Sequence, residues 1–221
     1  MEAWQYAVNH PDILAGAVVT HIKLSLIAVA FATILGVGLG AYIASSGRER
    51  TADTVLYLAE IMMTIPSLAL FGLLMFTLGA MDLTAVGFLP ATIALIVYGQ
   101  LPILRNTYIA IKGVDSALIE AGRGMGMTDR QLLVRVKLPL AVPVIMAGLR
   151  NSIILIIGIA TIAALIGAGG LGSLIFRGLT NGRMDLIIVG GVSVAIFALL
   201  VDGLMSRVEL WVTPKGLRKR G

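Results

Sequence analysis

Apolar runs long enough to cross a membrane alternate with short polar connections along most of the chain. A bilayer core of roughly 30 Å needs about 20 apolar residues in a helix, and five runs reach that length. The predicted spans are residues 24–44, 54–78, 89–111, 140–166 and 184–205. The pattern therefore predicts an all-α, polytopic membrane protein with five transmembrane helices inside one transmembrane domain, residues 24–206.

The two ends of the chain differ from the spans. Residues 1–23 are mildly amphipathic and lack the basic start of a secretory signal. Trp4 and Tyr6 belong to residue types that favour the membrane interface, so we expect this segment to lie outside, at the membrane surface. A contact with a partner protein is the alternative. Residues 207–221 form a basic tail.

Composition agrees with a membrane protein. Hydrophobic side chains make up 58% of the 221 residues and charged side chains 13%, and the mean hydropathy is +0.97. These values exclude an ordinary soluble domain. The absence of cysteine excludes disulfides and thiolate metal sites.

The basic residues gather on one side of the predicted membrane. One side of the predicted membrane has twelve basic residues: Arg48, Arg50, Lys112, Arg123, Arg130, Arg135, Lys137, Arg207, Lys215, Arg218, Lys219 and Arg220. The other side has three: Lys23, Arg177 and Arg183. Cytoplasmic loops carry the excess of Lys and Arg, so we expect the N-terminus outside and the C-terminus in the cytoplasm. The net charge of +5 is therefore a topology signal and does not indicate nucleic-acid binding.

The longest polar passage, residues 112–139, connects the third and fourth spans. Asp115 and Ser116 can accept hydrogen bonds from the free N–H groups of a first helical turn, which predicts a short helix after them. Two glycines around Met125 end that helix.

A second short helix is predicted to follow. Thr128 and Gln131 have the spacing of a capping box, and Pro139 is expected to stop the helix. The passage therefore predicts a compact surface knob, with Met125 and Met127 exposed.

The spacing within this passage resembles the EAA loop of ABC importer permeases. Glu120-Ala121-Gly122 is followed after three residues by Gly126 and, nine residues later, by Val136-Lys137-Leu138-Pro139. In that family the loop forms coupling helices that dock into a groove of the cytoplasmic ATPase. The family usually has Ala in place of Gly122 and often Ile in place of Val136. An ordinary amphipathic loop is the alternative. The resemblance implies these coupling residues: Glu120, Ala121, Gly122, Gly124, Met125, Gly126, Met127, Leu138 and Pro139.

Over most of residues 60–180 the chain resembles one particular group within this family. The stretches PSLALFGLLMFTLG, LPILRNTYIAIKGVDSALIEAGRGMGMT, VKLPLAVPVIMAGLR and AALIGAGGLGSLIFRG are similar to permeases of osmoprotectant importers for glycine betaine, carnitine or choline. This small five-span type is also seen in methionine importers. The resemblance implies a type I ABC importer permease architecture. Two permease subunits, either two copies or this chain and a paralogue, would pair around a central path, with ATPases below and a substrate-binding protein above.

Pro66 falls in the middle of the second span, where it must remove one helical hydrogen bond. A freed carbonyl in lipid has to be satisfied by protein or water, so we expect the kink to face the bundle interior. Because transporters often place broken helices along the pathway, Pro66 and Ser67 are candidates for lining it. A plain structural kink is the alternative.

Charged residues also occur within the spans. Arg105 in the third span and Glu60 in the second lie at a similar predicted depth. Since a charge at that depth is costly, we predict that these two side chains lie near each other. The alternative is that Arg105 extends to the cytoplasmic interface. Arg150 and Asp202 could compensate each other in the same way.

Glycines give two further predictions. Gly36 and Gly40 form a GxxxG pair, which favours close packing against another helix; tolerated glycines in an apolar helix are the alternative. Residues 167–172 formally match GxGxxG, but the dinucleotide motif needs a preceding strand, and here a membrane span precedes it. We expect these glycines to let the chain turn and re-enter as a short segment over residues 171–179.

The motifs that are missing limit the function. No GxxxxGK[ST] sequence occurs, and His10 and His21 lack metal-ligand spacing, so we expect no catalysis and no cofactor in this chain; ATP and Mg would bind to the partner ATPase. The sequence predicts a permease subunit in a bacterial or archaeal cytoplasmic membrane, importing glycine betaine or a related osmoprotectant by alternating access. Methionine or another zwitterion is an alternative substrate, and an ion-coupled carrier or channel is the alternative class. Substrate-binding residues are not identified.

Overall fold

The computed structural model describes residues 2–214, and every regular element in that part of the chain is a helix. The α-helices are α1 (Glu2–Asn9), α2 (Pro11–Ser45), α3 (Glu49–Thr64), α4 (Ser67–Ala80), α5 (Phe88–Lys112), α6 (Ser116–Gly124), α7 (Asp129–Leu132), α8 (Leu138–Ile162), α9 (Gly172–Thr180) and α10 (Met184–Val212). A π-helical turn, η1 (Leu133–Lys137), and a 3-10 turn, η2 (Ala163–Ile166), complete the set.

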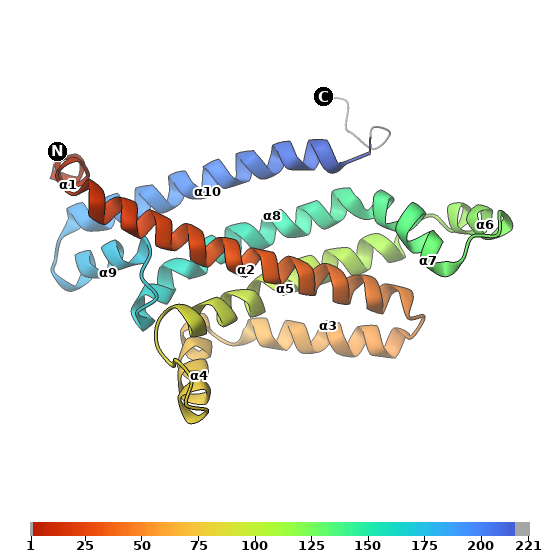
Figure 1. Cartoon of the computed structure of the whole chain (residues 1–221), viewed down its shortest axis with the longest axis horizontal. Coiled ribbons are helices and arrows are strands. Elements are labelled where there is room, and N and C mark those ends of the chain that lie inside the picture. The colour runs from red at the N-terminus through yellow and green to blue at the C-terminus, as the bar shows by residue number, and fades with distance from the viewer. Residues whose placement is uncertain (1, 215–221) are drawn as a thin grey trace.

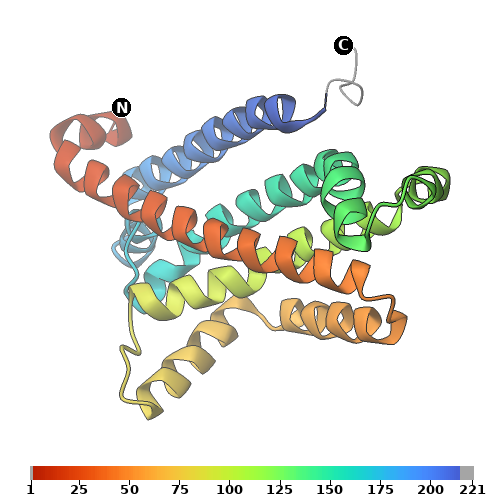
Figure 2. The same cartoon turned by 45° about the vertical axis from the view of Figure 1, so that its right-hand side comes forward.

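The core lies where α5 packs between α2 and α8 (Figure 1). Its buried side chains include Leu24 and Ala28 from α2, Leu95 from α5 and Ile156 from α8, together with Phe71 from α4. α10 packs on α9 and α1 at one end and on α8 further along, and it diverges from α2 toward its C-terminal end (Figures 1 and 2).

The GxxxG pair lets α2 approach α5 closely. A Cβ atom on Gly36 would lie 2.8 Å from Cβ of Ile103, and one on Gly40 would lie 2.7 Å from Cβ of Thr107. Neither position has room for a side chain, so the predicted packing role of these glycines is confirmed.

The described residues contain four helices long and apolar enough to cross a membrane, and the bent pair α3–α4 would make a fifth span. α5 and the α8–η2 segment closely match the predicted third and fourth spans. α2 instead begins at Pro11 and runs through Gly16 without interruption. The predicted boundary at residue 23 therefore falls inside one continuous helix. α10 likewise continues to Val212, beyond the predicted end at 205; residues 215–221 of the basic tail lie outside the described residues.

The second span is broken at Pro66. α3 and α4 meet at an angle of 99°, which is a much sharper change than the predicted kink. Ile65 adopts an extended conformation (φ −67°, ψ 125°), as the residue before a proline prefers. Its carbonyl accepts a hydrogen bond from the hydroxyl of Tyr98 on α5. The core thus satisfies one backbone group at the break, although Pro66 itself is exposed.

Pro139 does not stop a helix, contrary to the prediction. It lies in the first turn of α8, and α7, η1 and α8 follow one another without a break. In η1 the N–H of Leu138 donates to the carbonyl of Leu133, one residue further back than in an α-helix. This wider turn accommodates a proline, whose ring would clash with the carbonyl four residues before it in a regular helix.

The glycine-rich stretch after η2 turns the chain back. Gly167, Gly169 and Gly170 all have left-handed φ values of +78° to +80°, which favour glycine. α9 follows immediately, which confirms a short separate segment at the predicted place, residues 171–179; its return into the membrane stays a prediction.

Candidate functional site

The passage between α5 and α8 forms the predicted pair of short helices. Oδ1 of Asp115 accepts from the N–H of Ala117 at 2.9 Å and caps α6. Thr128 and Gln131 form a complete capping box at the start of α7, with N···O distances of 3.3 and 2.8 Å. Gly126 makes the turn between the two helices with φ +77°. Local side-chain chemistry therefore fixes this conformation, as predicted.

α6 and α7 are joined by a small apolar contact. A Cβ atom on Gly122 would lie 2.5 Å from Cδ2 of Leu132, which is 1% exposed. The sulfur of Met127 is 3.4 Å from the same point, and this side chain is half-buried. The predicted exposure of Met127 is wrong, because the left-handed turn at Gly126 directs the following residue back toward α6.

The outer surface of the knob is polar with an apolar tip. Glu120, Ala121 and Gly124 are exposed, and Met125 is 72% exposed. Arg123 makes a solvent-exposed contact with Asp129, Nη2 to Oδ1, at 3.6 Å. An exposed methionine surrounded by charged and small residues is typical of a protein-binding surface.

The remaining candidate coupling residues lie at the base of the knob. Leu138 and Pro139 are half-buried in the first turn of α8. Leu138 packs against a buried cluster formed by Ala44, Ala110, Ile111 and Ala141. These residues attach the knob to the bundle and are not on its outer surface.

The structure brings Glu60 and Arg105 together. Oε1 of Glu60 on α3 and Nη1 of Arg105 on α5 are 3.0 Å apart. The two side chains keep 45% and 58% of their surface exposed in the single chain. The pair joins the broken helix α3 to the helix that leads into the knob.

Arg150 and Asp202 also pair, and they recruit a third residue. Nη2 of Arg150 contacts both carboxylate oxygens of Asp202 at 2.8 and 3.0 Å, and Nη1 reaches Oε2 of Glu209 at 3.3 Å. Glu209 was not predicted from the sequence. The seven-residue spacing from Asp202, which places both carboxylates on one face of α10, was the available signal.

Pro66 is exposed and Ser67, the first residue of α4, is half-buried. Ile65 beside them packs against the core. The break thus has one side inside the bundle and one side open, and whether the open side lines a path stays a prediction.

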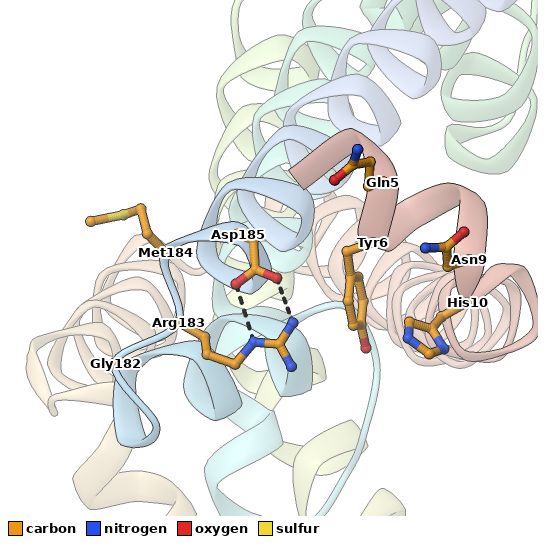
Figure 3. A pocket seen from close by; sticks show the side chains of 8 residues that line it. All are labelled: Gln5, Tyr6, Asn9, His10, Gly182, Arg183, Met184 and Asp185. Atoms are coloured by element: carbon orange, nitrogen blue, oxygen red, sulfur yellow. Dashed lines mark hydrogen bonds and ion pairs between the residues drawn. The ribbon is translucent and has the colours of Figure 1, made fainter. Parts of the chain in front are cut away.

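A polar pocket of about 500 Å³ lies between α1 and the turn from α9 to α10 (Figure 3). The guanidinium of Arg183 contacts Asp185, Nη2 to Oδ2, at 2.5 Å and lies 5.2 Å from the centre of the Tyr6 ring. Tyr6 is 7% exposed, whereas Trp4 is 75% exposed; the predicted position of both residues at the membrane interface stays a prediction. Among the described residues no group of three His, Cys, Asp or Glu side chains could hold a metal ion.

This chain is similar in sequence to known transport proteins. The model of the family "Binding-protein-dependent transport system inner membrane component" matches residues 36–214. The carnitine transport permease protein OpuCB of Listeria monocytogenes is 45% identical over 90% of this chain and 88% of its own length. The osmoprotectant import permease protein OsmW of Salmonella typhimurium is 40% identical over 99% of this chain and all of its own.

A solved structure supports the same fold. A chain of the MetNI methionine ABC transporter in inward-facing conformations superposes with a TM-score of 0.82 at 24% identity, covering 93% of this chain and 99% of that one. At this identity the likeness concerns the fold alone. The knob, the packed spans and the family match over residues 36–214 together establish that the chain belongs to the family of binding-protein-dependent transport system inner membrane components, as a permease subunit of an ABC transporter.

Proposed function

We propose that this chain imports glycine betaine or a related quaternary-ammonium osmoprotectant. The observation that carries this substrate class is the activity named for its relatives, carnitine and osmoprotectant permeases of 40–45% identity along at least 90% of the chain. Methionine is the second candidate, but the likeness to the methionine transporter extends to the fold alone. Membership of an ABC permease family removes support for an ion-coupled carrier or channel.

The knob is proposed to dock into a separate cytoplasmic ATPase that binds ATP and Mg. Its support is the exposed tip at Met125 between Glu120 and Gly126, within the passage whose spacing resembles the EAA loop. Closure of the ATPase pair on ATP would push this surface and open the permease outward, and hydrolysis would reset it. A substrate-binding protein would deliver solute at the opposite face.

A second permease subunit, either another copy or a paralogue, is proposed to complete the path. Glu60 and Arg105 are about half exposed within predicted spans, and charges facing lipid are costly. A partner subunit or a water-filled path beside α3 and α5 would remove that cost. Pro66 and Ser67 lie just after the end of α3, where α4 begins, and are proposed to line this path.

The test is to co-purify the tagged chain with its ATPase from the native membrane and to reconstitute the complex. We expect ATPase activity to rise with binding protein loaded with glycine betaine, carnitine or choline, and not with methionine. Stimulation by methionine alone would overturn the substrate class. A purified chain without any ATPase would overturn the coupling role.

The orientation is testable separately, since the natural chain has no cysteine. Asn9 and Met125 are both exposed, so each can carry a single cysteine. An impermeant maleimide added to intact cells should label Asn9→Cys, and Met125→Cys only after the membrane is opened. The reverse pattern would contradict the proposed N-out topology.

A further inference from the structure

α1 is held at the start of α10 by a cation–π contact. Tyr6 is buried, and the guanidinium of Arg183 lies 5.2 Å from the centre of its ring (Figure 3). Asp185 orients that guanidinium, because its carboxylate accepts hydrogen bonds from Nε and Nη2 of Arg183 at 3.2 and 2.5 Å. Tyr6, Arg183 and Asp185 together form a clasp between α1 and α10.

The clasp is seated on an apolar cluster that is separate from the main core. Tyr6 packs in this cluster with residues from three helices, namely Ala17 of α2, Leu171 and Leu174 close to or within α9, and Leu186 and Val189 of α10. Within the described part of the chain, these buried residues are not shared with the core between α2, α5 and α8. α1 can therefore leave its place without opening the main core.

α1 has little besides the clasp to hold it. Ala3 and Ala7 pack against the same cluster, but each buries only one methyl group. Trp4 and Val8 are exposed, and a polar pocket remains between α1 and the turn that leads into α10. A helix of 8 residues is also too short to persist alone, since isolated helices below about 12–15 residues are marginal in water. The helical state of α1 therefore depends on its docking.

Through this docking, α1 joins two helices that diverge elsewhere. At one end it leads into α2, which begins at Pro11, and its clasp holds the start of α10, at the end of the bundle opposite the knob (Figure 1). α2 and α10 also meet where the rings of His21 and Phe197 lie 5.7 Å apart. Toward its C-terminal end α10 leans away from α2 (Figures 1 and 2) and is tied to α8 by Arg150. Docked α1 thus resists movement of the start of α10 relative to α2.

We propose that α1 is a releasable strap on the outer end of the permease. In the docked state the clasp holds α10 beside α1. In the released state Tyr6 leaves the cluster, α1 loses its helical structure, and the start of α10 moves freely relative to α2. The states differ by one cation–π contact and a small apolar area, so a partner that binds one of them better shifts the equilibrium.

The role of the strap in transport rests on the proposed function. Opening of the permease toward the outside moves helix ends on the outer side, and a docked strap opposes that movement. Release of α1 therefore accompanies outward opening. A weaker clasp makes opening easier, and the ATPase then needs less help from the binding protein.

Hydrogen exchange of the permease in nanodiscs measures release directly. The N–H of His10 donates to the carbonyl of Tyr6 at 3.0 Å, so this end of α1 exchanges when the helix is lost. Arg183→Gln removes the cation from the ring without changing α1, and should speed exchange of residues 6–10 roughly 2–5-fold, the factor for one exposed cation–π contact. Tyr6→Leu, which removes the ring, should act in the same direction. Tyr6→Phe keeps the ring and should leave exchange unchanged.

Arg177→Gln is the matched control. Arg177 is an exposed arginine of α9 at the same end of the bundle, and it makes no ion pair within the described residues. This variant should leave the exchange of α1 unchanged. Equal acceleration by Arg177→Gln and Arg183→Gln would show a general effect of charge and overturn the clasp, as would unchanged exchange in Arg183→Gln.

The second readout is ATP hydrolysis by the permease–ATPase complex without binding protein. Arg183→Gln should raise this rate by up to the same 2–5-fold and reduce the further stimulation by loaded binding protein, whereas Arg177→Gln should change neither. Faster exchange of α1 with unchanged or slower hydrolysis would overturn the role of the strap in opening. The exchange measurement needs neither ATPase nor transported solute, so failure of the strap and failure of the proposed import function give different results.

Discussion

The left-handed turn at Gly126 provides a sharp test of the knob. Gly126 has φ +77° and open space around its Cβ position, so Gly126→Ala is opposed by backbone strain alone, about 1–2 kcal/mol. That lowers the ratio of folded to disrupted knob roughly 5–30-fold. Gly124→Ala is the matched control, because its Cβ position is also open and its φ is not left-handed. There we expect no loss and a gain of up to about 1 kcal/mol from helix propensity.

The assay is the number of substrate molecules imported per ATP hydrolysed in proteoliposomes containing the permease, ATPase and binding protein. Gly126→Ala should reduce this ratio severalfold while the amount of inserted permease stays normal. Gly124→Ala adds a methyl group to the same surface without backbone strain, so it should lose much less coupling than Gly126→Ala. If Gly126→Ala couples as well as Gly124→Ala, the conformation of this turn has no part in coupling. If both lose coupling equally, the loss comes from the added methyl on the surface, and backbone strain is refuted as its cause.

Three other predictions concern the stability of the bundle, each measured by thermal unfolding in nanodiscs. Gly40→Val should cost about 1–3 kcal/mol by overpacking the contact with α5, whereas Gly38→Ala on the open face should be neutral or slightly stabilising; equal effects would contradict the packing role. Arg150→Gln should cost roughly 1–3 kcal/mol, since the paired groups are about a third exposed, and adding Asp202→Asn should recover part of it. Tyr98→Phe should cost about 1–3 kcal/mol by leaving the carbonyl at the helix break unsatisfied, and an unchanged transition would show that water replaces the hydroxyl.

Features set by neighbouring residues could be predicted from the sequence. The caps at Asp115 and Thr128 need only side chains two or three residues from the backbone groups they bind. The turn at Gly167 and the returning helix follow from glycine's access to left-handed backbone. The GxxxG pattern predicted that this face of α2 packs against another helix, although the sequence did not identify α5 as that helix.

Features set by tertiary contacts could not be predicted. A proline in the first turn of a helix and one that ends a helix look alike locally, so the sequence does not distinguish the two at Pro139. The π-turn that accommodates it has no sequence signature. The sulfur of Met127 packs near Gly122 of α6 once Gly126 has turned the chain, and the hydroxyl of Tyr98 satisfies a carbonyl 33 residues earlier in the chain. None of these depends on hydrophobic periodicity.

The attachments of the knob indicate where the bundle can bend. Leu132 at the end of α7 packs against Gly122 of α6, and α7 continues through η1 into α8. α8 is held to α5 by the hydroxyl of Ser152, which donates to the carbonyl of Gly99 at 2.6 Å, and to α10 by Arg150. A force on the knob would therefore move α5, α8 and α10 together.

The break between α3 and α4 is held by fewer side-chain contacts than the helices that carry the knob. Two exposed residues, Pro66 and Thr64, flank it, and the hydroxyl of Tyr98 makes the long-range hydrogen bond to its backbone. Hinges are a few residues at element ends that absorb backbone rotation, whereas continuous, side-chain-tied helices move as rigid bodies. If the permease alternates between two openings, we expect the backbone rotation to concentrate at Ile65 and Pro66, with the Glu60–Arg105 pair limiting how far α3 can separate from α5.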